Sequence, residues 1–185
     1  MRMTGSMTSF KAQAEIKPFR QINLQIKIYS SLSGILAYHM KDLSKPELIF
    51  LKPNKNENGQ LHFMEEPTSI PFAVKRLFWL DRIAEDVTRG IHAHREELQV
   101  LVCLSGRVTA LLENLAGEKF SFELDSPSKA LFVPSMVWTE FTFGKGAVLL
   151  GISDRQFSEE DYIRQREEFD SFQKNFALNS QTIAN

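Results

Sequence analysis

The sequence predicts an all-β fold, an antiparallel jelly-roll barrel with an N-terminal extension and a C-terminal helix. From Pro46 onward, short runs rich in β-branched and aromatic residues alternate with turn signals such as Ser105-Gly106. Roughly nine such runs follow one another without a helical pattern between them, which favours antiparallel pairing over strands joined by crossover helices. After Ser158 the apolar residues change to a helical period.

Turn residues delimit the expected strands. The extended segments expected in the first part of the domain are 48–51, 60–64, 72–80, 92–94 and 99–104. Those expected in the second part are 107–113, 119–124, 130–133, 138–143 and 147–153. Residues 98–104 are apolar on both strand faces apart from Gln99, so this strand needs a second layer over its outer face. A dimer partner or the C-terminal helix is expected to supply that layer.

The two ends of the chain differ from this central part. Residues 1–45 are expected to form an extension or arm that packs on the domain or on a partner. Residues 46–175 are expected to form the domain itself, and residues 176–185 a polar, frayed tail.

The helix near the end of the domain is expected to run from Glu159 to Phe172, with Ser158 as its N-cap. Tyr162, Phe169 and Phe172 fall on one face at helical spacing, so this face is expected to pack on the barrel.

Composition excludes several functional classes. Lysine and arginine total 22 and aspartate and glutamate 23, so the net charge of −1 predicts neither a nucleic-acid partner nor a polybasic membrane surface. No apolar stretch is long enough to span a bilayer, and the first ten residues lack the apolar core of a signal peptide. The single Cys103 has no second cysteine for an internal disulfide, which is typical of a cytoplasmic protein.

His92 and His94 are the strongest candidates for chemistry. At positions i and i+2 of a strand, the two imidazoles point to the same face. Two imidazoles on the concave face of a sheet are costly in a dry core because each needs a polar partner, so a functional site is favoured over a structural role. Imidazoles with a pKa of about 6.5 both take and give protons at neutral pH, which suits enolisation beside a carbonyl.

The segment from Gly90 to Gly106 resembles the first motif of the cupins, which implies that the predicted jelly roll is a cupin barrel. Metal-binding cupins carry a glutamate after the histidines and a further histidine in the second motif, where this chain has Gln99 and Thr139. These residues make a poor ligand set, so we expect no metal and no other cofactor. Glu96 or Glu97 would substitute only if the turn after His94 directed one of them inward.

Several motifs in the same order resemble the WxcM-like sugar-nucleotide 3,4-ketoisomerases, over about residues 48 to 170. The motifs are Ile70 to Arg76, Arg89 to Arg95, Gln99 to Cys103, Leu124 to Pro127, Trp138 to Glu140 and Asp161 to Arg164. The resemblance implies a homodimeric cupin that acts on a dTDP-4-keto-6-deoxyhexose. It further implies that His92 and His94 shuttle a proton between carbons 3 and 4 of the sugar.

The chain departs from this family at several polar positions, which carry Asn58, Phe78, Trp79, Thr139 and Phe157. Two hypotheses therefore stay open. The intact histidine pair favours an isomerase, and the missing tyrosines favour a non-catalytic cupin that binds a sugar nucleotide or a related small molecule. A metal-dependent oxygenase would need a ligand set that this sequence lacks.

Five further residues are candidates for substrate binding. Arg89 precedes the histidines and suits a pyrophosphate, although a solvated loop arginine is equally expected. Arg76 points inward if Val74 and Phe78 do, since the three share strand parity. Gln99 stands at the site position of the cupin motif. Trp138 is a core residue or a stacking surface, and Glu140 on the same strand face orients a histidine or forms a surface ion pair. The candidates are thus Arg76, Arg89, Gln99, Trp138 and Glu140.

Overall fold

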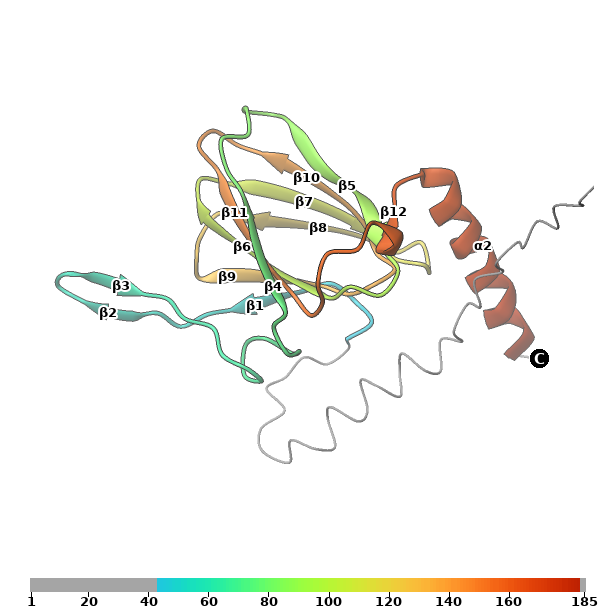
Figure 1. Cartoon of the computed structure of the whole chain (residues 1–185), viewed down its shortest axis with the longest axis horizontal. Helices are drawn as coiled ribbons and strands as arrows, with labels where there is room; N and C mark the ends of the chain where they lie inside the picture. Colours follow the sequence, from blue (N-terminus) through green and yellow to red (C-terminus); the bar gives the residue numbers. More distant parts are fainter. Residues whose placement is uncertain (1–42, 184–185) are drawn as a thin grey trace, which may run out of the picture. The chain divides into compact units, whose positions relative to one another are not determined.

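The computed structural model describes residues 43–183, so nearly all of the predicted extension at 1–45 lies outside the described residues. The described chain forms two five-stranded antiparallel sheets, a small separate hairpin and a C-terminal helix (Figure 1). The strands are β1 (Glu47–Phe50), β2 (Asn54–Asn56), β3 (Gly59–Leu61), β4 (Arg76–Leu80), β5 (Thr88–His94), β6 (Gln99–Ser105), β7 (Val108–Glu113), β8 (Lys119–Leu124), β9 (Lys129–Val133), β10 (Trp138–Phe143), β11 (Val148–Ser153) and β12 (Tyr162–Ile163). A 3₁₀ turn, η1 (Glu159–Asp161), precedes β12, and α2 (Arg166–Ile183) follows it.

One sheet has the strand order β1-β9-β6-β11-β4 and the other β12-β5-β10-β7-β8. Sequence neighbours such as β5 and β6 thus lie in different sheets, as expected for a jelly roll, and the antiparallel fold class is confirmed. The inward-facing residues of both sheets meet in one apolar core, which includes Leu101 and Leu149 from the first sheet and Leu112 and Phe143 from the second. The candidate site lies beside this core, since Leu101, Phe143 and Leu149 also line its pocket.

The outer face of β6 is covered by the chain itself. Val100 and Val102 pack in a second buried cluster against Ile70 and Phe72, which lie in the segment before β4. The expected strand at 72–80 is correspondingly shorter, since only Arg76–Leu80 pairs with β11. The segment before β4, and not α2, covers Val100 and Val102, because periodicity shows that a strand is covered and not which segment covers it.

The helical prediction for residues 159–172 was wrong in its boundaries. Ser158 makes no side-chain cap, and the segment it begins is the short η1 turn. Tyr162 belongs to β12 and pairs with His94 of β5, so it does not lie on a helix. The helix starts at Arg166 and continues through most of the segment expected to be a frayed tail.

Helix α2 packs on the outside of the second sheet, as predicted. Phe169 is fully buried against Trp138 and Ile163, and its ring centroid lies 5.6 Å from that of Trp138. None of the helices in the described part of the chain has the length and apolar character needed to cross a membrane.

Candidate active site

A pocket of about 540 Å³ opens between the two sheets. Its inner wall is apolar, and its polar lining includes His92, Gln99, Tyr162, Arg89 and Arg164. The apolar wall consists of Phe78, Leu80, Leu101, Phe141, Phe143 and Leu149. A concave apolar chamber with a few convergent polar groups is the usual form of a small-molecule site.

A β-bulge in β5 decides which side chains face this pocket. Against β10, His92 pairs with Thr139 but Arg89 pairs with Phe141, so β5 has one extra residue between them. Gly90 in this bulge has a φ of 67°, a backbone conformation that glycine adopts without strain. The bulge places Arg89 on the same face as His92, although simple alternation would put them on opposite faces. Arg89 is exposed and lies at the rim of the pocket.

The two histidines lie side by side at the end of β5, as their spacing predicted. The Nε2 atoms of His92 and His94 are 3.2 Å apart, and the rings meet edge to face with centroids 4.9 Å apart. His94 is 6% exposed, whereas His92 is half-buried and lines the pocket. Tyr162 stands over both rings, with centroid distances of 4.8 Å to His92 and 4.4 Å to His94.

His92 is a weaker base than the sequence suggested. Burial, then the neighbouring His94 and Arg164, lower the pKa of His92 from 6.5 to about 4. The imidazole of His92 is therefore neutral at neutral pH. Burial also raises the pKa of Tyr162, with a further contribution from Glu97, so its phenol stays protonated and can donate a hydrogen bond.

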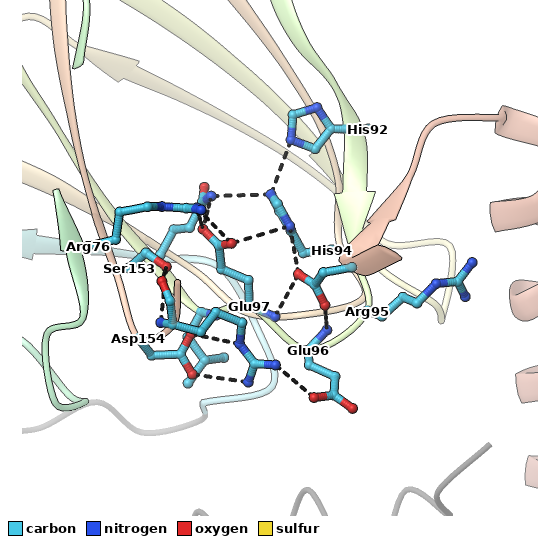
Figure 2. A network of polar contacts seen from close by, with 12 residues as sticks. Arg76, His92, His94, Arg95, Glu96, Glu97, Ser153 and Asp154 are labelled. Carbon is cyan, nitrogen blue, oxygen red and sulfur yellow. Dashed lines mark hydrogen bonds and ion pairs between the residues drawn. The ribbon is translucent and has the colours of Figure 1, made fainter. Parts of the chain in front are cut away.

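A buried ionic network lies behind the histidines (Figure 2). Glu97, whose side chain is 1% exposed, accepts two hydrogen bonds from Nη2 of Arg76 at 2.6 and 2.8 Å. Gln99 donates its amide to Oε1 of Glu97 at 2.7 Å and lies 3.2 Å from Nε2 of His94. Arg76 therefore points inward, as strand parity predicted. The turn after His94 directs Glu97 inward, and Glu96 stays exposed.

Trp138 and Glu140 do not reach the pocket. Trp138 is buried between the sheet and α2, and its indole N–H lies 3.3 Å from the carboxylate of Glu140. Their neighbour Phe141 lines the pocket, so alternation along β10 directs Trp138 and Glu140 to the opposite face. The expected face of β10 is therefore not the pocket face, because parity shows which residues share a face and not which face lies inside.

Thr139 faces inward but has a structural role. Its hydroxyl contacts the carbonyl oxygens of Gly90 at 2.6 Å and of His92 at 3.1 Å. These contacts hold the backbone of β5 at the bulge, close to the first histidine.

Sequence reasoning missed three residues of the site. Oδ2 of Asp161 lies 2.9 Å from Nδ1 of His94, a contact that the expected helix did not suggest. Tyr162 was expected to pack on the barrel, and Arg164 falls within the helix that was expected from Glu159 to Phe172. Arg164 instead lies over the ring of Tyr162 at 4.2 Å and forms a bidentate ion pair with Glu159. The signal available in the sequence was the motif Asp161 to Arg164, whose first residue ends η1, whose next two form β12, and whose last follows β12 directly.

Within the described residues, His94, Glu97 and Asp161 form a cluster whose ligand atoms lie within 4.8 Å of one another. Their oxygens already accept hydrogen bonds: those of Asp161 from two backbone N–H groups, and those of Glu97 from Arg76 and Gln99. The guanidinium of Arg76 already supplies the positive charge beside Glu97 that a bound cation would otherwise supply. The donor set therefore suits a hydrogen-bonded network better than a divalent cation.

Comparison with known proteins agrees with this geometry. A curated relative, the TDP-4-oxo-6-deoxy-α-D-glucose-3,4-oxoisomerase of Aneurinibacillus thermoaerophilus, is 35% identical over 134 residues, which cover 71% of this chain and 92% of the relative. The 3,4-ketoisomerase QdtA of Thermoanaerobacterium thermosaccharolyticum, crystallised with TDP, is 34% identical with a TM-score of 0.66, covering 71% of this chain and 96% of QdtA.

A histidine-to-asparagine variant of QdtA, crystallised with TDP-4-keto-6-deoxyglucose, is 32% identical with a TM-score of 0.66 and covers 77% of this chain and 99% of that chain. The model of the family described as FdtA, WxcM-like, C-terminal, matches residues 44–174. The histidine pair, the jelly roll and these matches agree, and the chain belongs to the WxcM-like (FdtA) family of cupin-fold proteins.

Proposed function

We propose that this protein is a sugar-nucleotide 3,4-ketoisomerase that acts on a dTDP-4-keto-6-deoxyhexose. The observation that carries the proposal is the pair His92 and His94, whose Nε2 atoms are in contact at the pocket. The curated relative and QdtA, which are named for this reaction, support the same assignment.

The reaction needs a base and an acid on neighbouring carbons. A proton leaves carbon 3, and the electrons of that C–H bond form an enediol between carbons 3 and 4. A proton then adds at carbon 4, while the hydroxyl proton moves from the oxygen of carbon 3 to that of carbon 4. His92 lines the pocket and its Nε2 atom contacts Nε2 of His94, so the pair can move this proton at one bound sugar without a metal.

The remaining polar groups suit the rest of the substrate. Arg89 and Arg164 lie at the exposed rim of the pocket, where their guanidinium groups match the geometry of a diphosphate. Arg164 would exchange its ion pair with Glu159 for one with the diphosphate. Gln99 lies in the pocket beside the histidines. Arg76 does not line the pocket, so its proposed part is indirect: it holds Glu97, which accepts from Gln99 in the pocket.

Proton exchange at carbon tests the proposal directly. The purified protein is mixed with dTDP-4-keto-6-deoxyglucose in deuterated water, and the sugar protons are followed by NMR. We expect the 3-keto product, with deuterium at carbon 4 in those molecules in which the proton held by the histidines exchanges with solvent before it returns to the sugar. A protein that leaves the sugar unchanged at every concentration tested would overturn the isomerase proposal.

A non-catalytic binding protein is the second candidate. Phe78 and Phe157, at positions where the family resemblance implies tyrosines, lie over the guanidinium of Arg76 and make this side of the pocket less polar. Binding of TDP-sugars without formation of the 3-keto product would favour this candidate.

We also propose that the protein is a homodimer. Strand β4 is an edge strand, and its outward-facing Leu77 and Trp79 are 58% and 67% exposed. Exposed apolar residues on a sheet edge are typical of a surface that another chain covers. The β2–β3 hairpin, which projects beyond the sandwich in Figure 1, adds Leu61 at 61% exposed.

Replacing Trp79 with Asp is expected to convert the dimer to a monomer, because a carboxylate would be buried without a partner in the interface. Light scattering at micromolar concentration measures the mass of both proteins. Leu178→Asp, an exposed position on α2, is the matched control and should leave the dimer intact. A wild-type protein with a monomeric mass would contradict the proposal.

A further inference from the structure

The carboxylate of Asp161 lies directly behind the histidine pair, on the side of His94 away from His92. Its Oδ2 atom is 2.9 Å from Nδ1 of His94, whereas the Nε2 atom of the same ring faces His92. Asp161 is 8% exposed, and it lies at the end of η1 immediately before β12 pairs with the histidine strand. It has no part in the reaction as proposed above.

We propose that Asp161 is a positioning residue, which holds His94 in the tautomer whose Nε2 lone pair faces His92 and stabilises the imidazolium that forms there during proton transfer. The inference rests on the proposed ketoisomerase function for its catalytic consequence. Its structural part, the tautomer of His94, is independent of any activity.

The tautomer follows from the donors and acceptors around the ring. An ionised carboxylate only accepts hydrogen bonds, so the proton between Asp161 and His94 resides on Nδ1. In a neutral imidazole the other nitrogen is then an acceptor. The amide of Gln99 lies 3.2 Å from this Nε2 atom, which agrees with an acceptor at that position, because the same amide also donates to Glu97.

Asp161 is itself held in its ionised form. Its Oδ1 atom accepts the backbone N–H of Glu96 at 2.8 Å, and its Oδ2 atom accepts that of Glu97 at 3.3 Å. Burial, the largest single influence, raises the pKa of this carboxyl, but the hydrogen bonds from His94 and Glu96 and the nearby charge of Arg155 together bring the pKa below its ordinary value. The backbone donors also fix the direction of the carboxylate.

The second carboxylate near His94 does not take this role. Oε2 of Glu97 lies 3.7 Å from Nδ1 of His94, beyond hydrogen-bond distance, and its charge is balanced by Arg76. Asp161 is therefore the carboxylate that orients the ring.

In this arrangement His92 exchanges the proton with the sugar, and His94 carries the positive charge. When His92 accepts the proton from the sugar at Nδ1, it passes its Nε2 proton to Nε2 of His94. His92 is neutral before and after, and the positive charge resides on His94 beside Asp161. The electrons of the broken C–H bond remain in the enediolate, and the reverse transfer returns a proton to the neighbouring carbon. The low pKa of His92, about 4, agrees with a residue that transmits a proton without retaining it.

The tautomer is tested first, on the wild-type protein without substrate. Ring nitrogens of ¹⁵N-histidine-labelled protein are observed by NMR at neutral pH, and His94→Asn identifies the signals of His94 among the four histidines. We expect Nδ1 of His94 to carry the proton and Nε2 to be bare. A bare Nδ1 with a protonated Nε2 would overturn the inference, whether or not the protein isomerises sugars.

Asp161→Asn then tests the catalytic consequence. It keeps the size of the side chain but removes the negative charge, so kcat is expected to fall by about 10²- to 10⁴-fold with TDP affinity unchanged. Glu160→Gln, an exposed neighbour, is the matched control and should keep full kcat. Asp161→Glu restores the charge and should recover part of the lost rate.

The outcomes separate the two proposals. Wild-type protein with the expected tautomer but no isomerase activity would contradict the proposed function and leave the positioning of His94 intact. Active wild-type protein whose Asp161→Asn variant is folded, binds TDP and retains full kcat would overturn the positioning role. If Asp161→Asn does not fold, the NMR result on the wild-type protein decides the tautomer.

Discussion

Replacing His92 or His94 with Asn is expected to lower the turnover of dTDP-4-keto-6-deoxyglucose by about 10²- to 10⁴-fold, the usual cost of losing a general acid or base. Asparagine keeps a polar side chain of similar reach but has no group that exchanges a proton near neutral pH. The affinity for TDP should change little, because its proposed contacts come from Arg89 and Arg164. Initial rates and TDP titrations of each variant measure the two quantities separately.

His62→Asn is the matched control for this pair. His62 contacts Ser128 at 3.5 Å and does not line the pocket, so its loss should leave turnover unchanged. Full isomerase activity in both site variants would show that the catalytic assignment is wrong. A loss of TDP binding in step with the loss of turnover would instead assign the histidines to binding.

Replacing Arg76 with Met is expected to lower the free energy of unfolding by about 3–5 kcal/mol, because it leaves the carboxylate of Glu97 buried without its counter-charge. The side chains are 18% and 1% exposed, so water cannot replace the lost guanidinium. Turnover should fall as well, since Glu97 also accepts from Gln99 beside His94. Urea unfolding of the wild type and the variant measures the difference in stability.

Arg107→Met provides the comparison at an exposed ion pair. Arg107 and Glu123 are 3.7 Å apart with side chains 63% and 49% exposed, and such pairs contribute at most about 1 kcal/mol. The double variant Arg76→Met/Glu97→Met should recover much of the lost stability, because it removes the unpaired charge. A single Arg76 variant as stable as Arg107→Met would contradict the ionic role assigned to this network.

The jelly roll could be predicted from sequence because its signals are local. Turn residues and apolar runs mark the strands wherever the chain pairs them, and a period of two residues places His92 and His94 on one face. The same rule placed Arg76 beside Phe78, and Figure 2 shows Arg76 directed toward the histidines. These properties depend only on neighbours within a few positions along the chain.

The position of each face and the partners of each histidine depend on residues far apart in sequence. The same period of two could not show that Trp138 and Glu140 face outward, because the choice of inner face depends on how two sheets pack. Arg89 joined the site through the extra residue of a bulge that is defined only against β10.

By itself, the sequence determined the fold class, most of the strands and the pairing of two imidazoles, since each rests on local periodicity. Only the tertiary structure decided which groups act on those imidazoles. Asp161 is 67 residues from His94, and it reaches Nδ1 because β12 pairs with β5 across the sheet edge. Hydrogen bonding depends on position to within a fraction of an ångström, and that position is set by the packing of the whole domain.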